Sequence, residues 1–149
     1  MKNSSSSKTN FDLWLLIGKA QHSIMLVRQR ELIQYHIPIR QLHVLRTIME
    51  LGSRSTLMEV AKEVEREPHA ISKQSARMEK DGLIKRIKKT PKSNLLKLEL
   101  TDRGLALAQL AQQSESIDLV FSVLSREERE MLEIILNKIA GKAKNLNST

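Results

Sequence analysis

"PHAISKQSARMEKDGLIKRIKKTPK", residues 68–92, is the stretch in which the positive charge of this chain is most concentrated. Residues 66–97 contain ten lysines and arginines but three acids, which gives this segment a net charge of +7 against +8 for the whole chain. The ten cations are Arg66, Lys73, Arg77, Lys80, Lys85, Arg86, Lys88, Lys89, Lys92 and Lys97. Such a concentration of charge predicts a surface that faces a polyanion.

The first half of this stretch has the pattern of a helix. Pro68 suits a first helical position, where a missing N–H does no harm, and Asp81 with Gly82 provides an end. We therefore predict a helix over residues 68–80, with Ile71, Ser75 and Met78 turned inward. The opposite face would present short polar or basic groups: His69, Ser72 or Lys73, Ala76, Arg77 and Lys80.

The second half predicts a small β-hairpin. The segment "LIKRIKK" (83–89) is followed by the turn "TPKSN" (90–94) and then by "LLKLEL" (95–100), in which apolar leucines alternate with Lys97 and Glu99. The hairpin is rich in lysine and follows the basic helix directly. It is therefore predicted to extend the same cationic surface.

Two further helices are predicted ahead of the basic helix. Thr56 stands three residues before Glu59, a capping-box pattern that opens a short helix. This helix would bury Leu57, Val60, Ala61 and Val64. Before it, Pro38 and Gly52 frame a helix that carries Leu42, Leu45, Ile48 and Met49 in register.

The N-terminal segment from Asp12 to about Gln34 predicts a helix that is apolar over much of its circumference. Its apolar residues are Leu13, Leu15, Leu16, Ile17, Ala20, Ile24, Met25, Leu26 and Val27. So wide a surface must be covered by the rest of the domain or by a second subunit. Asp12 and Lys19 interrupt the run before it reaches the length of a bilayer span, so neither a membrane segment nor a secretory signal is predicted.

The C-terminal third predicts two more helices. Thr101 caps a long helix from Asp102 to about Leu124, with Leu105, Ala108 and Ala111 as its first inward residues. Ser125 and Glu128 form a second capping box. The last helix would carry Met131, Leu132, Ile135, Leu136 and Ile139.

The composition favours one mainly helical domain. The chain has 149 residues, 3% aromatics and five glycines, which is typical of helices rather than sheets. It has no cysteine, which excludes disulfides, thiolate metal sites and cysteine nucleophiles and fits a cytoplasmic protein. We predict a flexible tail over residues 1–10 and a single domain over 11–145.

Two short helices followed by a lysine-rich hairpin are typical of a winged helix-turn-helix, in which one helix enters the major groove of DNA. His69, Ser72 and Lys73 lie where base contacts are usually made, whereas the other basic residues would hold phosphates. The predicted DNA-binding residues are Thr56, His69, Ser72, Lys73, Arg77, Lys85, Lys88, Lys89, Lys92, Ser93 and Asn94. The alternative is a solvated basic face without a partner, but charge, helix order and hairpin together favour DNA.

Several motifs resemble the MarR family of bacterial and archaeal transcription regulators. "IPIRQLHVLRTI" resembles its second helix, "STLMEVAKEVEREPHAISKQSARMEKDGLIKR" its helix-turn-helix, "LELTDRG" the end of its wing, and "LSREEREML" the start of its last helix. The resemblance implies a homodimer formed by helices at about 11–35 and 101–145, with a DNA-binding lobe at about 37–100. It further implies recognition helices about 10 bp apart on a pseudo-palindrome.

The wing departs from the family pattern. Members commonly carry a D-x-R-R motif at the wing tip, whereas residues 89–94 of this chain contain neither Asp nor Arg. Lys92 takes the place of the arginine, but a lysine lacks the planar guanidinium fork. We therefore predict that the wing contributes salt-sensitive phosphate binding more than minor-groove specificity.

Many family members also bind small phenolic or anionic effectors, so the resemblance leaves a small-molecule effector open. Trp14, Met25 and His43 are candidates for such a crevice, and the alternative is that they are core residues. The four histidines show no close ligand pair, and we predict no metal and no cofactor.

The sequence therefore predicts a homodimeric DNA-binding transcriptional regulator, acting as a repressor in the cytoplasm. The rival from another class is an architectural protein that binds DNA without sequence preference. We predict no enzymatic activity, because no glycine-rich phosphate loop, carboxylate pair or nucleophile motif is recognisable.

Overall fold

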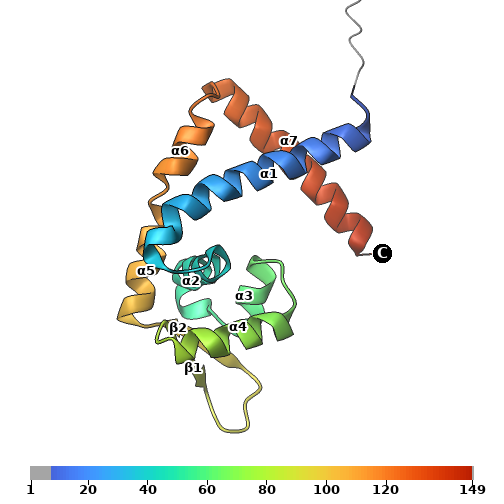
Figure 1. Cartoon of the computed structure of the whole chain (residues 1–149). Helices are drawn as coiled ribbons and strands as arrows, with labels where there is room; N and C mark the ends of the chain where they lie inside the picture. The colour runs from blue at the N-terminus through green and yellow to red at the C-terminus, as the bar shows by residue number, and fades with distance from the viewer. Residues whose placement is uncertain (1–7, 149) are drawn as a thin grey trace, which may run out of the picture. The chain divides into compact units, whose positions relative to one another are not determined.

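The computed structural model describes residues 8–148, which form two compact units divided after Ser114 (Figure 1). The first unit contains α1 (Asn10–Leu32), α2 (Ile39–Leu51), α3 (Leu57–Glu63), α4 (Pro68–Lys80), β1 (Ile84–Lys88), β2 (Leu96–Leu100) and α5 (Asp102–Gln112). Short 3-10 turns, Ile33–Tyr35 and Gly52–Arg54, flank α2. The second unit contains α6 (Glu115–Phe121) and α7 (Arg126–Asn147). The mainly helical fold with a winged helix-turn-helix is confirmed.

Helix α1 begins at Asn10, two residues before the predicted start. Thr9 is the reason: its hydroxyl accepts a hydrogen bond from the Asp12 N–H, and the Asp12 carboxylate accepts from both the hydroxyl and the N–H of Thr9. The hydrogen bond from the Thr9 hydroxyl to the Asp12 carboxylate, and then the bond from the Thr9 N–H, hold the pKa of Asp12 below its ordinary value. Thr9 and Asn10 therefore belong to the helix start rather than to a tail, and residues 1–7 of the predicted tail lie outside the described residues.

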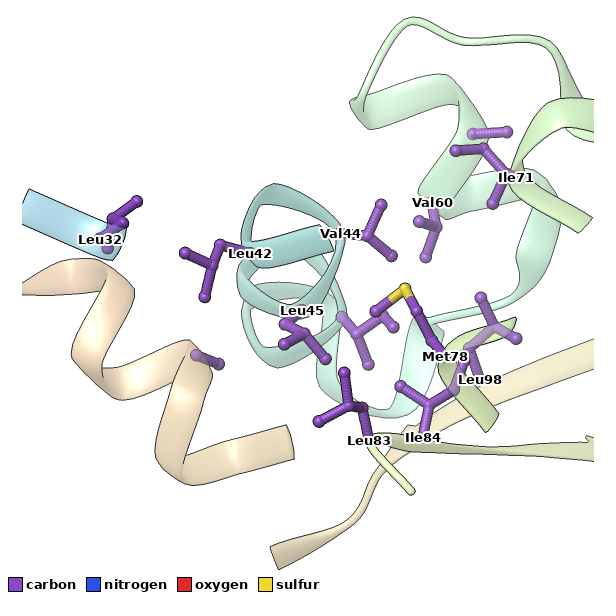
Figure 2. Packing of buried hydrophobic residues seen from close by; sticks show 13 residues of the cluster. Leu32, Leu42, Val44, Leu45, Val60, Ile71, Met78, Leu83, Ile84 and Leu98 are labelled. Carbon is purple, nitrogen blue, oxygen red and sulfur yellow. The ribbon is translucent and has the colours of Figure 1, made fainter. Parts of the chain in front are cut away.

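The core of the first unit is built mainly from α2, α3, α4 and the hairpin. Leu45, Ile71 and Leu98 are fully buried, as the helix and strand patterns predicted. Figure 2 shows the Met78 side chain of α4 extending among the apolar side chains of the neighbouring elements. Burying a side chain of this size contributes roughly 1.5–3 kcal/mol to folding. The core thus fixes α4 by its inner face and leaves the outer face to solvent.

A tight turn and a polar brace set the direction of α4. After α3 the chain turns at Glu65, which has a φ of 52°, and the Arg66 N–H donates to the Ala61 carbonyl at 3.0 Å. On α4, Gln74 donates from Nε2 to the Arg40 carbonyl of α2 at 3.1 Å and accepts from the Arg66 guanidinium. The side chain of Gln74 therefore braces α4 against the start of α2.

The two strands pair antiparallel in a register from Ile84 opposite Leu100 to Lys88 opposite Leu96, which confirms the predicted hairpin. Ser55, just before α3, extends the sheet. Its carbonyl accepts from the Leu98 N–H at 2.8 Å, and its hydroxyl donates to the Leu98 carbonyl at 2.5 Å. These bonds anchor the base of the wing, while the loop between the strands projects away from the lobe (Figure 1).

The end of α4 is joined tightly to the start of α5. The Thr101 N–H donates to the Leu83 carbonyl at 3.1 Å, and its hydroxyl donates to the Gly82 carbonyl at 2.7 Å. Gly104 is buried here, and the site requires glycine because a β-carbon would stand 1.9 Å from the Leu83 carbonyl oxygen. The predicted inward residue Leu105 is instead 39% exposed, since the glycine face makes the close contact.

The predicted single helix over 102–124 is wrong. Helix α5 ends at Gln112, and α6 starts at Glu115. The guanidinium of Arg28, on α1, donates to the Ala111 carbonyl at 2.7 Å and to the Gln113 carbonyl at 3.0 Å. It thereby satisfies carbonyls that a continuing helix would have bonded internally, and Ser114 and Ser116 favour a helix boundary over a helix interior.

The second unit confirms the predicted capping box of α7. The Ser125 hydroxyl accepts from the Glu128 N–H at 3.1 Å, and the Glu128 carboxylate accepts from the Ser125 N–H at 2.8 Å. Several apolar side chains of α7 are exposed in the single chain: Met131, Ile134, Ile135, Leu136 and Ile139. The same holds for much of α1. Within residues 8–148, no helix combines the length and the apolar character required to cross a bilayer.

Candidate nucleic-acid interface

The outer face of α4 carries three of the predicted site residues on successive turns. His69, Lys73 and Arg77 are four residues apart, so they stand one above another along the helix, and all three are exposed. Pro68 at the first helical position fixes the start of α4, and Ile71 and Met78 anchor its inner face. The fold therefore presents a polar and cationic stripe on a rigidly held helix.

A hollow lies between α3, α4 and the wing, and five predicted site residues line it. Its volume is about 280 Å³, and those five residues are Thr56, Ser72, Lys88, Ser93 and Asn94. They come from segments up to 38 positions apart, from Thr56 to Asn94, so the fold brings them together. Two have local roles: the Thr56 hydroxyl caps α3 by accepting from the Glu59 N–H, and the Ser93 hydroxyl accepts from the Leu95 N–H.

The remaining predicted residues lie on the wing. Lys85 is on β1, and Lys89 and Lys92 are in the loop between the strands; all three are exposed. On β2, Lys97 forms an ion pair with Glu99 at 3.3 Å, so one of the cations counted in the basic segment already has an acidic partner. The wing loop thus presents lysines that are available to a polyanion.

Arg86 is a residue that the sequence reasoning counted for its charge but did not assign to the site. Its Nη2 donates to the Ser72 hydroxyl at 3.3 Å, and its backbone N–H donates to the Glu79 carboxylate at 2.6 Å. The alternation of side chains along β1 could have indicated this contact, because Arg86 lies two residues after the buried Ile84 and so on the same face of the strand. Arg86 therefore touches α4, whereas its neighbour Lys85 is exposed.

The three candidates for an effector crevice do not come together in the first unit. Trp14 lines a hollow of about 470 Å³ along α1, and His43 lines a different, polar hollow of about 430 Å³ beside α2. All three are exposed, so the alternative that they are core residues is wrong for the single chain. No cluster of three or more potential metal-ligating side chains occurs in the described part of the chain.

Residues 37–91 match the family model described as MarR family. The winged-helix lobe is similar to the MarR family. The matched segment contains α2, α3, α4 and β1 and reaches into the wing loop, so it covers most of the predicted interface. A search of curated protein sequences found no match.

Solved structures of other proteins share the fold over most of the chain. The organohalide-sensing transcriptional regulator RdhR-CbdbA1625, in its 2,4-dichlorophenol-bound form, is 26% identical, with 95% of this chain and 89% of that chain covered and a TM-score of 0.79. MepR of S. aureus in complex with DNA is 22% identical, with 91% and 99% covered and a TM-score of 0.80. MarR of E. coli without ligand is 21% identical, with 85% and 96% covered and a TM-score of 0.67.

Proposed function

We propose that this chain is a sequence-specific transcriptional regulator that binds double-stranded DNA as a homodimer and represses from a pseudo-palindromic operator. One observation carries the proposal: the exposed stripe of His69, Lys73 and Arg77 lies on a helix that is buried on its other side and flanked by a lysine-bearing wing. A slim helix with a polar and cationic outer stripe fits the major groove, and the wing lysines reach phosphates beside it. The DNA complex of MepR, which has the same fold, supports this arrangement.

The homodimer is supported by the apolar side chains that the single chain leaves exposed. On α1, Trp14 is 64% exposed and Leu16 is 47% exposed, and α7 has a similar set. Exposed large apolar side chains in such numbers usually mark a protein interface. A two-fold dimer would present two copies of α4 to half-sites about one DNA turn, roughly 10 bp, apart.

We further propose that a small-molecule effector releases the protein from DNA. The 2,4-dichlorophenol complex of RdhR-CbdbA1625, which is 26% identical, supports an effector of small aromatic character. The apolar hollow on α1 beside Trp14 is a candidate to receive it. We assign no enzymatic activity to the chain, and we place it in the cytoplasm, where its DNA target would be.

The experiment that tests the proposal is selection of DNA fragments from a random pool by the purified full chain, followed by sequencing. The expected result is one enriched motif with two-fold symmetry and half-sites about 10 bp apart. A pool that stays random after selection at moderate salt would refute sequence-specific regulation.

An architectural DNA-binding protein is the alternative, and the same cationic surface would serve it. A competition assay separates the two functions. A specific regulator binds its selected site typically about 10³-fold or more tightly than scrambled DNA, so scrambled competitor displaces it poorly. Equal competition by both DNAs would favour the architectural protein.

Lys73→Ala tests base reading by α4. Lys73 is exposed in the N-terminal half of α4, where side chains reach base edges. We expect the substitution to weaken binding to the selected operator by roughly 1–3 kcal/mol and to change binding to scrambled DNA far less. Fluorescence anisotropy on both DNAs measures the difference. Equal losses on the two DNAs would assign Lys73 to the phosphate backbone.

Arg77→Ala tests phosphate contact one turn further along α4. We expect weaker binding to both DNAs and a slope of log K against log salt that is shallower by about one unit, because one fewer counterion is released. Titrations between low and moderate salt measure the slope. An unchanged slope would remove Arg77 from the interface.

A further inference from the structure

Arg86 stands where the wing meets the recognition helix. It pairs with Leu98 in the middle of the hairpin, on the strand face that also holds the buried Ile84. Its two partners on α4, Ser72 and Glu79, are seven residues apart and so lie on one face of that helix, two turns from each other. Arg86 therefore bonds the helix at two separate levels.

Within the described residues, the guanidinium of Arg86 has one hydrogen-bonded nitrogen and one buried nitrogen without a partner. Its Nη2 donates to the Ser72 hydroxyl, but its Nε is buried and has no hydrogen-bond partner in the described part of the chain. A buried donor without a partner destabilises the fold, so such groups call for another explanation. The contact with Ser72 places this guanidinium next to a residue that lines the hollow between the helix and the wing.

The contact determines what the Ser72 hydroxyl can offer to a ligand. A hydroxyl has one proton to donate and two lone pairs to accept with. Because the positively charged guanidinium occupies a lone pair, the hydroxyl proton turns away from it. Ser72 is thus prepared as a donor for an acceptor on a base edge in the major groove, such as N7 or O6 of guanine.

We propose that Arg86 is a positioning residue for DNA reading: it holds the Ser72 hydroxyl as a donor toward a base-edge acceptor and ties the wing to α4. This inference rests on the proposed function, since it concerns the same DNA interface. Arg86 itself does not contact a phosphate in this arrangement. Its effect on specificity passes through Ser72.

The test compares Arg86→Met, Ser72→Ala and the double variant on the selected operator and on scrambled DNA. Methionine keeps an unbranched stem and removes the guanidinium. We expect each single variant to lose about tenfold in operator affinity, the size of one hydrogen bond to a base edge, with little change on scrambled DNA. The double variant should be no weaker than either single variant, because both remove the same contact. The salt slope should stay that of the wild type.

Lys85→Met is the matched control, since Lys85 is the exposed neighbour on the same strand. We expect it to flatten the salt slope by about one unit and to leave base preference unchanged. Arg86→Lys, which keeps a charged donor, should retain most of the operator preference. If Arg86→Met unfolds in a thermal melt, Ser72→Ala, which removes the same contact from the helix side, serves as the test variant.

Three results would overturn the role of Arg86: an operator affinity of the methionine variant equal to that of the wild type, additive losses in the double variant, or a slope that falls as in Lys85→Met. Each of these would appear against a wild type that still prefers its operator. A wild type without that preference would instead refute the proposed function, and the role of Arg86 would fall with it.

Discussion

Gly104→Ala is expected to destabilise the first unit by roughly 3 kcal/mol or more, at or above the upper end of what overpacking costs. A β-carbon at this position would stand 1.9 Å from the Leu83 carbonyl oxygen and 3.0 Å from its carbon, and neither atom belongs to a flexible side chain. Helix α5 must therefore move away from the end of α4. That movement would stretch the 3.1 Å bond from the Thr101 N–H to the same carbonyl. Urea unfolding followed by circular dichroism measures the loss.

Gly141→Ala is the matched control for that prediction. Gly141 is also inside a helix, α7, but a β-carbon there would meet no atom within 4 Å. Alanine is favoured over glycine in a helix interior, so this variant should gain up to about 1 kcal/mol. Similar effects from the two substitutions would contradict the close backbone contact at Gly104.

Local signals in the sequence were sufficient to predict most of the first unit. Pro38 and Gly52 bound α2, Pro68 opens α4, and leucine alternation marks β2. Each of these depends on residues within a few positions of one another, which is why a single sequence reveals them. The break between α5 and α6 depends instead on Arg28, more than 80 positions away from the carbonyls that it bonds. Nothing near residue 113 other than its serines indicated that break.

The candidate site was predictable in its residue types and less so in its contacts. Charge and helix order identified His69, Lys73 and Arg77 as outward residues, and all three are exposed. Arg86 was left out because its role depends on Ser72, a contact across elements that charge counting does not contain. The role of Gly104 likewise depends on the Leu83 backbone. Such close approaches between separate elements become visible only in the folded chain.

The exposed apolar surface of α1 leads to the second large expected effect, on dimerisation. Ile17 is 42% exposed in the single chain although it belongs to the predicted apolar stripe. Ile17→Lys would place a charge in the proposed dimer interface, where an unpaired buried charge is strongly unfavourable. We expect sedimentation to show a monomer, and operator affinity to fall at least about 100-fold because one half-site is lost. The added positive charge would by itself favour DNA, so repulsion does not account for a loss.

Gln29→Lys adds the same charge at an exposed polar position of α1, roughly 120° around the helix from Ile17, and we expect it to remain a dimer with normal operator binding. Thermal melts of the wild type test dimerisation independently, because a melting temperature that rises with protein concentration indicates that folding is linked to association. If Ile17→Lys sediments as a dimer and binds the operator as the wild type does, the apolar face of α1 does not form the subunit interface. The repeated recognition helix that a pseudo-palindromic operator requires would then have to arise from another surface of the chain, and the exposed face of α7 would be the next to test.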